Sequence, residues 1–411
     1  MSDTVSETVT SERTATGSAA AGPATGRSRS LLKPLLLAVG FVILLLVPIY
    51  VEEFWLRTGF AVFGAAIGAI GLNLLVGTTG QLSLAHAFFL AVGAVTYTYV
   101  SGEPGGVATE VGGLSLPPLL GMIAGVLLAG LAGLLFSPVA ARLRGIYLGV
   151  ASLGLVFIGI HLINTWGTVT GGFNGRIAPD FSLFGFEFSN NASYLAIAGV
   201  PFREAERLWY LGLFLAIGAY WFAHNLLRSR PGRALQTLRD SEVAASVMGV
   251  NVQGYKARVF LVSSMYAGLS GVLLALSIGS IAPESFGLLV SIQYLAMVVL
   301  GGLGSVGGAA LGALFVSALP LVFQRYADII PLVSASRSDP GIAPGEAARF
   351  LYGLAIILII LYEPGGLAGL ARRFRRPGRP GGGRTARPSS AATSSSTSTV
   401  PSDPPAQGST T

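Results

Sequence analysis

Residues 59–76 read GFAVFGAAIGAIGLNLLV, eighteen consecutive positions without a charged side chain. An uncharged apolar stretch of this length is a candidate for a helix that spans a bilayer. Nine more apolar runs lie before and after it along the chain. They cover residues 35–50, 84–100, 117–139, 146–163, 208–227, 260–278, 290–303, 309–323 and 350–362. The sequence therefore predicts an all-α, polytopic transmembrane bundle of about ten spans.

The composition requires lipid as the solvent for much of the chain. Of the 411 residues, 52% are hydrophobic and only 11% are charged, whereas soluble domains carry about 25% charged residues. A chain with so few charges cannot cover a large water-facing surface. Cysteine is absent, which excludes disulfides, thiolate metal sites and cysteine nucleophiles. The net charge of +7 is better explained by basic residues on the cytoplasmic side of a membrane than by nucleic-acid binding.

The distribution of charge favours a topology with both termini in the cytoplasm. If the N-terminus is inside and ten spans alternate, 19 of the 26 Lys and Arg residues lie inside and 12 of the 19 acidic residues lie outside. Basic residues collect on the cytoplasmic side, so an N-in/C-in chain with an even span count fits. Within the stretch 288–323, residues 301–308 read GGLGSVGG. This stretch could form two helices, a re-entrant hairpin or one broken helix, so eight spans plus a re-entrant hairpin is the alternative.

Composition divides the chain into three regions. Residues 1–30 are rich in Ser, Thr, Ala and Gly and are expected to be a disordered cytoplasmic extension. Residues 31–370 form the transmembrane domain, with a polar cytoplasmic loop at 228–256 and an external loop at 165–207. Residues 371–411 are a basic, Ser- and Pro-rich, low-complexity segment that is expected to be a disordered cytoplasmic tail.

The cytoplasmic loop carries the strongest local pattern. Its Pro-Gly pair at 231–232 predicts a turn. Residues 234–238 and 242–248 then predict two short helices, with Asp240 or Ser241 as an N-cap. Loops between spans are usually short and irregular, whereas this one contains helix formers, caps and small residues.

This loop resembles the EAA loop of ABC importer permeases, in the version found in branched-chain amino-acid permeases of the LivM type. The residues that carry the resemblance are Gly232, Arg233, Arg239, Asp240, Glu242, Ala244, Ala245 and Gly249. The resemblance implies that the short helix docks into a groove of an ATPase subunit, with small residues permitting close approach and Glu and Arg as charge partners at the rim. The general motif has Glu directly before Ala-Ala, whereas Val243 intervenes here.

Three further segments support the resemblance. Residues 71–94 are similar to the family's Gly-Gln-x-Ser signature, 291–308 to its late Gly-rich segment, and 170–175 to an external Thr-Gly-Gly element. The external segment 165–207 is expected either to contact a binding protein or to cap the pore. Polar residues beside glycines suggest a helix interruption whose freed backbone is buried in protein or lines a cavity, or else hydrogen bonding between helices. The candidate residues for a translocation path or helix break are Asn73, Gly80, Gln81, Ser83, His86, Gly301, Gly302 and Gly304.

The resemblance implies an ABC importer permease fold and one subunit of a larger assembly. The implied partners are a second homologous permease subunit, two cytoplasmic ABC ATPases, an extracytoplasmic solute-binding protein and the lipid bilayer, with no nucleic acid. The chain has no Walker A motif, so we expect no enzyme activity, no bound metal or cofactor, and ATP-Mg on the partner subunits. The implied cargo is Leu, Ile or Val, with urea or short amides as the alternative, and the implied location is a bacterial-type plasma (inner) membrane.

Two other functions compete with this interpretation. Gly268-Leu-Ser270-Gly271 matches the Gly-x-Ser-Gly of rhomboid intramembrane proteases, but His86, His161 and His224 all precede it, whereas the base of that family follows it. An ion-coupled secondary transporter would place carboxylates or histidines near mid-membrane. No acidic residue falls centrally in a predicted span, which disfavours ion coupling.

Overall fold

The computed structural model describes residues 32–105, 111–143, 145–183, 185–189, 196–197, 200–327, 341–363 and 365–375. The chain divides into two units, Met1–Ala371 and Arg372–Thr411. The elements described below belong to the first unit, apart from the last residues of α14. The predicted extension at 1–30 and the tail beyond Arg375 lie outside the described residues.

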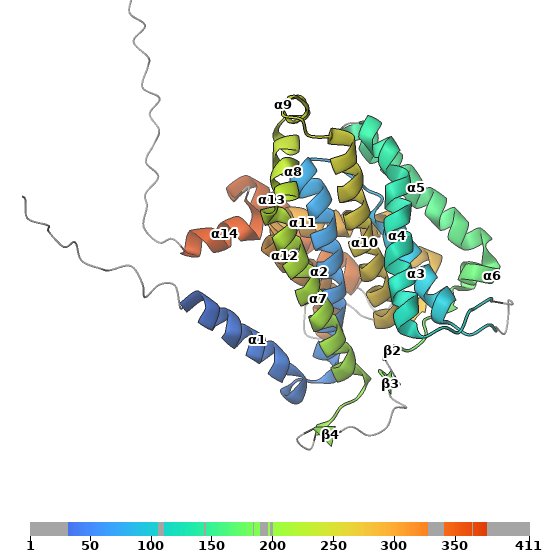
Figure 1. The fold of residues 1–411 in the computed structure, drawn as a ribbon. Coiled ribbons are helices and arrows are strands. Elements are labelled where there is room, and N and C mark those ends of the chain that lie inside the picture. Colours follow the sequence, from blue (N-terminus) through green and yellow to red (C-terminus); the bar gives the residue numbers. More distant parts are fainter. Residues whose placement is uncertain are drawn as a thin grey trace, which may run out of the picture. The chain divides into compact units, whose positions relative to one another are not determined.

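Most of the described chain is helical (Figure 1). The α-helices are α1 (Leu32–Tyr50), α2 (Glu53–Thr79), α3 (His86–Ser101), α4 (Pro118–Arg142), α5 (Ile146–Thr165), α6 (Gly167–Thr170), α7 (Glu204–Arg228), α8 (Arg230–Asp240), α9 (Glu242–Val247), α10 (Val252–Ile278), α11 (Leu288–Gly301), α12 (Val306–Arg325), α13 (Pro344–Tyr362) and α14 (Gly366–Arg375). Two 3-10 helices are η1 (Gly172–Asn174) and η2 (Pro283–Phe286). Three antiparallel pairs join β1 (Arg176–Ile177) to β6 (Ser280–Ile281), β2 (Ser182–Leu183) to β3 (Phe186–Glu187), and β4 (Ala196–Ile197) to β5 (Val200–Pro201).

Each of the ten apolar runs lies on a helix over most of its length. In the described chain, seven segments are long and apolar enough to cross a membrane, namely α2, α4, α5, α7, α10, the segment from η2 through α11, and α12. The other three runs lie on α1, α3 and α13. The polytopic helical architecture is therefore confirmed, while ten as the number of spans stays a prediction.

The stretch 288–323 forms two helices. α11 ends at Gly301 and α12 begins at Val306, and the two helices pack against each other. A Cβ at Gly301 would collide with the carbonyl of Gly308, and the reverse also holds. The chain thus reverses direction between them, so one broken helix is wrong. Two spans and a re-entrant hairpin both fit this geometry.

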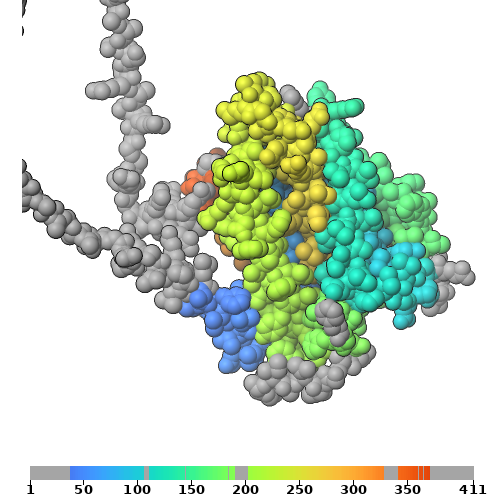
Figure 2. Space-filling model, viewed as in Figure 1, coloured from blue at the N-terminus to red at the C-terminus, as the bar shows by residue number. Residues whose placement is uncertain are grey.

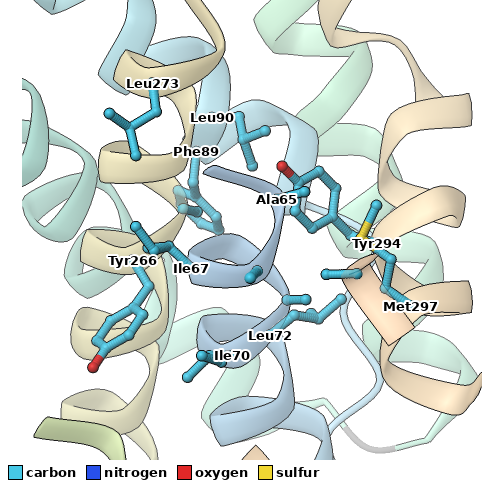
Figure 3. Close-up of a cluster of buried hydrophobic side chains, with 14 of the residues drawn as sticks. Ala65, Ile67, Ile70, Leu72, Phe89, Leu90, Tyr266, Leu273, Tyr294 and Met297 are labelled. Atoms are coloured by element: carbon cyan, nitrogen blue, oxygen red, sulfur yellow. The ribbon is translucent and has the colours of Figure 1, made fainter. Parts of the chain in front are cut away.

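Helix α2 is the central element of the bundle. It packs against α7, α10, α11 and α12, and most of its side chains are buried. Figure 3 shows part of this core, where Ile67 and Ile70 of α2 lie among Phe89 of α3, Leu273 of α10 and Met297 of α11. Lipid tails are as apolar as these side chains, so close packing rather than burial from water holds such helices together.

Close packing depends on glycines where α3 and α10 cross. A Cβ at Gly93 of α3 would collide with the backbone of Gly268 on α10, and a Cβ at Gly271 would collide with the carbonyl of Leu90. The two helices therefore meet through bare backbone, which small residues permit in membranes.

Loops that the sequence predicts on one side of the membrane lie together at one end of the helices. Arg239 of α8 contacts Gly77 near the end of α2, and both belong to predicted cytoplasmic ends. At the other end, Arg57 pairs with Glu204 at 3.4 Å, and both are predicted to be outside. In Figure 1, α9 lies at the first end and β2 and β3 lie at the second. Each of these contacts joins residues predicted on the same side, while the topology and the sidedness of each end stay predictions.

The predicted boundary at residue 370 falls inside a helix. α14 continues to Arg375, so the helix crosses this boundary, and the predicted disorder of the tail stays a prediction. The segment GLAGLARRFR is rich in Leu, Ala and Arg, which favour helix, and the first proline beyond it is Pro377.

We predict that Gly271→Ala destabilises the bundle by about 1–3 kcal/mol, because the new methyl group forces α3 away from α10. The matched control is Gly218→Ala on α7, where a Cβ meets nothing within 4 Å. Both changes add the same helix propensity, so thermal stability of the two purified variants in detergent isolates the packing cost. Equal stability of the two variants would contradict the close-approach account.

Candidate functional site

Helix α8 begins where the sequence predicts a turn. Pro231 lies in its first helical turn, a position that tolerates proline because the missing N–H has no helical partner there. The predicted Pro-Gly turn is therefore wrong, and the helix is interrupted at Ser229, which is extended, between α7 and α8. Gly232 permits this tight corner, since a Cβ there would collide with the carbonyl of Leu227.

Helix α9 confirms the second predicted short helix of the loop. Its N-cap is Ser241 rather than Asp240, because the Ser241 hydroxyl oxygen accepts a hydrogen bond from the N–H of Ala244 at 3.2 Å. Ala245 is fully buried. Gly249 follows the helix with a φ of +80°, a left-handed conformation that favours glycine. The small residues of the motif thus fix the shape of α9.

The outer face of α9 is apolar. Val243, Val247 and Met248 are 70%, 83% and 75% exposed, and we call these three residues the α9 apolar surface. Val243 and Val247 are four positions apart, so they share one helix face. Figure 2 shows α8 and α9 in yellow-green and yellow at the surface of this end. Exposed apolar patches mark contact with other molecules. Arg233 and Asp240 are also exposed on the loop.

Glu242 is tied to its own chain. Its carboxylate oxygen Oε1 lies 2.7 Å from Nζ of Lys256 on α10, and Lys256 is only 1% exposed. An ion pair with a buried ammonium stabilises both groups only while it is intact. The sequence predicts Glu242 as a charge partner at the rim of an ATPase groove. In the structure its carboxylate pairs with Lys256 of α10.

The predicted helix break lies between α2 and α3. α2 ends at Thr79 and is followed by Gly80, which has a φ of +68°. The N–H of Leu84 donates to the Ser152 hydroxyl on α5 at 2.8 Å, and the N–H of Ala87 donates to the Ser291 hydroxyl on α11 at 2.9 Å. The freed backbone is therefore satisfied inside the protein, as the environment of a bilayer requires.

The polar residues of the break have different roles. Ser83 accepts a local backbone hydrogen bond, and Nε2 of Gln81 donates to the carbonyl of Ala140 at 3.4 Å. Among the described residues, Oε1 of Gln81 and Nε2 of His86 are buried without a hydrogen-bond partner. The His86 ring lies 4.7 Å from the ring of Tyr294. These two buried atoms at the break therefore make no hydrogen bond within the described chain.

Asn73 lies about two helical turns before the break and joins two helices. Its Oδ1 accepts from the N–H of Gly304 at 2.9 Å, and its Nδ2 donates to the carbonyl of Ser305 at 3.0 Å. Gly302 and Gly304 have φ values of +107° and +80°, so the turn between α11 and α12 needs glycine. Asn73 therefore serves as a hydrogen-bonding contact between helices.

The two groups of candidate residues meet at Gly77. Nη1 of Arg239, from the α8–α9 loop, donates to the carbonyl of Gly77 at 2.7 Å. A Cβ at Gly77 would collide with the backbone of Gly304. On the other side of the same turn, Gly302 contacts Gly365 just before α14. The loop, the end of α2 and the Gly-rich turn are thus one connected site.

Sequence reasoning missed three residues of this site. Ser152 and Ser291 lie within apolar runs, and no local pattern marks them as partners of the α3 backbone. Lys256 carries a signal, because a lysine beside an apolar run needs a partner if it is buried. The described residues contain no group of three or more His, Asp and Glu side chains placed to share a metal ion.

Ser270 has a packing role in the structure. Its hydroxyl group lies 2.8 Å from the carbonyl oxygen of Gly64 and 2.8 Å from the hydroxyl of Tyr294. Neither partner is a histidine, and a serine nucleophile needs a base within hydrogen-bond reach. The serine therefore joins α10 to α2 and α11.

The Thr-Gly-Gly element at 170–172 folds onto the end of α5. The Thr170 hydroxyl donates to the carbonyl of Ile163 at 2.5 Å. The guanidinium of Arg176 donates to the carbonyl of Gly112 in a neighbouring loop, and Phe173 between them is 77% exposed. The element is a fixed turn with an aromatic side chain on its surface.

We predict that Glu242→Gln lowers stability by about 2 kcal/mol, because Lys256 is left as a buried charge without its counter-ion. The double variant Glu242→Gln/Lys256→Met should recover most of the loss, since both charges are gone. Thermal unfolding of the purified chain measures both effects, with Glu103→Gln on an exposed loop as the control. Additive losses in the double variant would contradict the pairing.

Known proteins share sequence with most of this chain. LivM of Escherichia coli, a high-affinity branched-chain amino acid transport system permease, is 30% identical over 314 residues, which cover 74% of this chain and 67% of LivM. The probable LivM of Methanocaldococcus jannaschii is 26% identical over 252 residues, covering 61% and 67%. The ribose import permease RbsC of Escherichia coli is 27% identical over 246 residues, covering 59% and 67%. No solved structure matches the chain.

A family model covers the whole candidate site. The model described as "branched-chain amino acid transport system / permease component" matches residues 56–360. This range contains the break after α2, the loop of α8 and α9, and the turn between α11 and α12. With seven span-length helices in the described chain, the protein is a multi-pass membrane protein. The chain belongs to the branched-chain amino acid transport system permease family.

Proposed function

We propose that this chain is the pore-forming subunit of an ATP-driven importer and that its α9 apolar surface docks a separate ATPase subunit. The observation that carries the proposal is this surface, which stands exposed on a rigid loop between two span-length helices. An exposed apolar helix face fits a groove on a partner.

Three contacts fix the conformation of the α8–α9 loop. Ser241 caps α9, Ala245 is buried beneath it, and the Glu242–Lys256 pair ties its first turn to α10. A preorganised surface loses little entropy on binding. ATP-driven closure of the ATPases would therefore push α10 and its neighbours as well as α9, which would give alternating access.

The energy source lies outside this chain. The Gly-rich residues 301–308 lack the Lys-Ser/Thr ending of a phosphate-binding loop, and they form a turn packed between helices. We place the end with α8 and α9 in the cytoplasm of a bacterial-type inner membrane, because basic residues collect there. Two ATPases would bind this end of a pair formed with a second homologous permease, and ATP-Mg would bind to them.

The external end would receive cargo from a solute-binding protein. The Thr-Gly-Gly element, with Phe173 exposed on a fixed turn, is the surface that we propose for this contact. Inside the bundle, the unpartnered atoms of Gln81 and His86 lie beside the break after α2. We assign them to the translocation path, where they could bond to a passing polar group.

We propose branched-chain amino acids as the cargo. The support is the higher identity to LivM than to the ribose permease RbsC. The similarity to RbsC shows that permeases named for different cargoes share sequence with this chain, so urea or short amides stay the alternative within the family. Coupling to an ion gradient is the alternative outside it.

We predict that Val247→Asp weakens binding of the ATPase subunit by roughly thirtyfold, because a carboxylate would be buried at the centre of an apolar contact. Co-purification of the ATPase with the tagged chain from detergent-solubilised membranes measures the loss. Membrane insertion and yield should not change, since Val247 is 83% exposed.

The matched control is Gln236→Asp, which adds the same charge to an exposed position of α8 away from the α9 apolar surface. The control should retain the ATPase. Equal retention by Val247→Asp and by the wild type would contradict docking on α9.

A further inference from the structure

Arg239 points from the loop into the bundle. It starts at the exposed side of α8, yet its Nη1 donates to the carbonyl of Gly77 at 2.7 Å. The two residues are 162 positions apart in sequence. The contact with Gly77 uses one N–H of the guanidinium and gives Arg239 a role inside this chain in addition to the one that the motif implies.

The Gly77 carbonyl is a strong site for this contact. It belongs to the last turn of α2, whose carbonyls have no helical N–H partner. Those carbonyls also carry the negative end of the helix dipole, which attracts a cation. A hydrogen bond from a charged donor is shorter and stronger than a neutral one. Arg239 thus caps α2 from another segment of the chain.

The capped turn is tied to a third segment. Asn73 lies one turn earlier on the same face of α2 as Gly77, and it bonds to both Gly304 and Ser305. A Cβ at Gly304 would lie 3.5 Å from Nη1 of Arg239. The end of α8, the end of α2 and the turn between α11 and α12 therefore form one linked corner.

This corner adjoins the points where the chain can bend. Gly80 follows three residues after Gly77 with a φ of +68°, and the chain then runs without helix to His86. The start of α3 is held by Ser152 and Ser291 rather than by α2. A displacement of the α2 end would consequently change the angle at the break.

We propose that Arg239 is a positioning residue that transmits displacement of the α8–α9 loop to the break between α2 and α3 and to the turn between α11 and α12. This inference rests on the proposed function, since it needs an ATPase that moves the loop. Arg239 would not contribute to docking itself. The α9 apolar surface binds the ATPase, and Arg239 transmits the displacement of the loop to the end of α2.

The test uses the assembled complex in proteoliposomes, with the second permease, the ATPases and the binding protein. We expect Arg239→Gln to keep the ATPases bound and hydrolysing, while uptake per ATP hydrolysed falls roughly tenfold because the charge-assisted bond is lost. Arg239→Lys keeps a cation near the carbonyl and should recover part of the ratio. The matched control is Arg230→Gln, at an exposed position on the same helix, which should keep the wild-type ratio.

A second variant approaches the corner from the other side. Asn73→Ala cuts the tie between α2 and the Gly-rich turn without touching the loop, and it should also lower uptake per ATP with the ATPases bound. Combined with Arg239→Gln it should cost less than the sum of the two single effects, because residues in one network are not additive. If Arg239→Gln is poorly recovered from membranes, Asn73→Ala alone tests whether the linked corner is needed for uptake per ATP.

Two results would overturn the inference. One is a normal ratio of uptake to hydrolysis in either Arg239→Gln or Asn73→Ala. The other is loss of the ATPases from Arg239→Gln, which would make Arg239 part of the docking surface. Failure of the proposed function is distinguishable from both, because it would show as absence of the ATPases from the wild-type complex.

Discussion

Backbone groups that leave a helix inside a bilayer must find partners within the protein, and this constraint organises the site. The break between α2 and α3 exposes the carbonyl of Gly77 and the N–H groups of Leu84 and Ala87. Each is satisfied by a side chain from another helix, supplied by Arg239, Ser152 and Ser291 respectively. The turn between α11 and α12 obeys the same rule through Asn73. The interrupted helices are thus held together by bonds between distant segments.

The same hydrogen bonds connect the α8–α9 loop to the central helix α2. Helix α9, fixed by its cap and by Lys256, carries the apolar surface on which we propose that an ATPase docks. The neighbouring helix α8 reaches the end of the central helix α2 through Arg239. Force applied at one end of the bundle can therefore act on the helix that lies at its core. Glycines at the contacts between helices keep this path short, because backbone touches backbone at Gly77 and Gly304.

Local patterns in the sequence predict the helices and the N-cap of α9 correctly, but they do not predict which distant residues form hydrogen bonds with each other. The ten apolar runs lie on helices over most of their length, and Ser241 caps the second loop helix, because apolar composition and capping are local properties. The Pro-Gly turn is wrong, since proline is as compatible with a first helical turn as with a bend. The sequence does not predict that Ser152 binds the N–H of Leu84, because the two residues are 68 positions apart. Likewise, the spacing of Glu242 within its motif does not reveal that Lys256, 14 residues later, holds its carboxylate.

The central claim is that this permease works by ATP hydrolysis on separate subunits. The most direct measurement is uptake of radiolabelled leucine into proteoliposomes that contain this chain, its homologous permease partner and the ATPases, with the binding protein on the cargo side. The account predicts uptake only when ATP and Mg²⁺ are present on the side of α8 and α9, and none under an ion gradient alone. Leucine accumulation by this chain without any ATPase, driven by an imposed proton or sodium gradient, would contradict it.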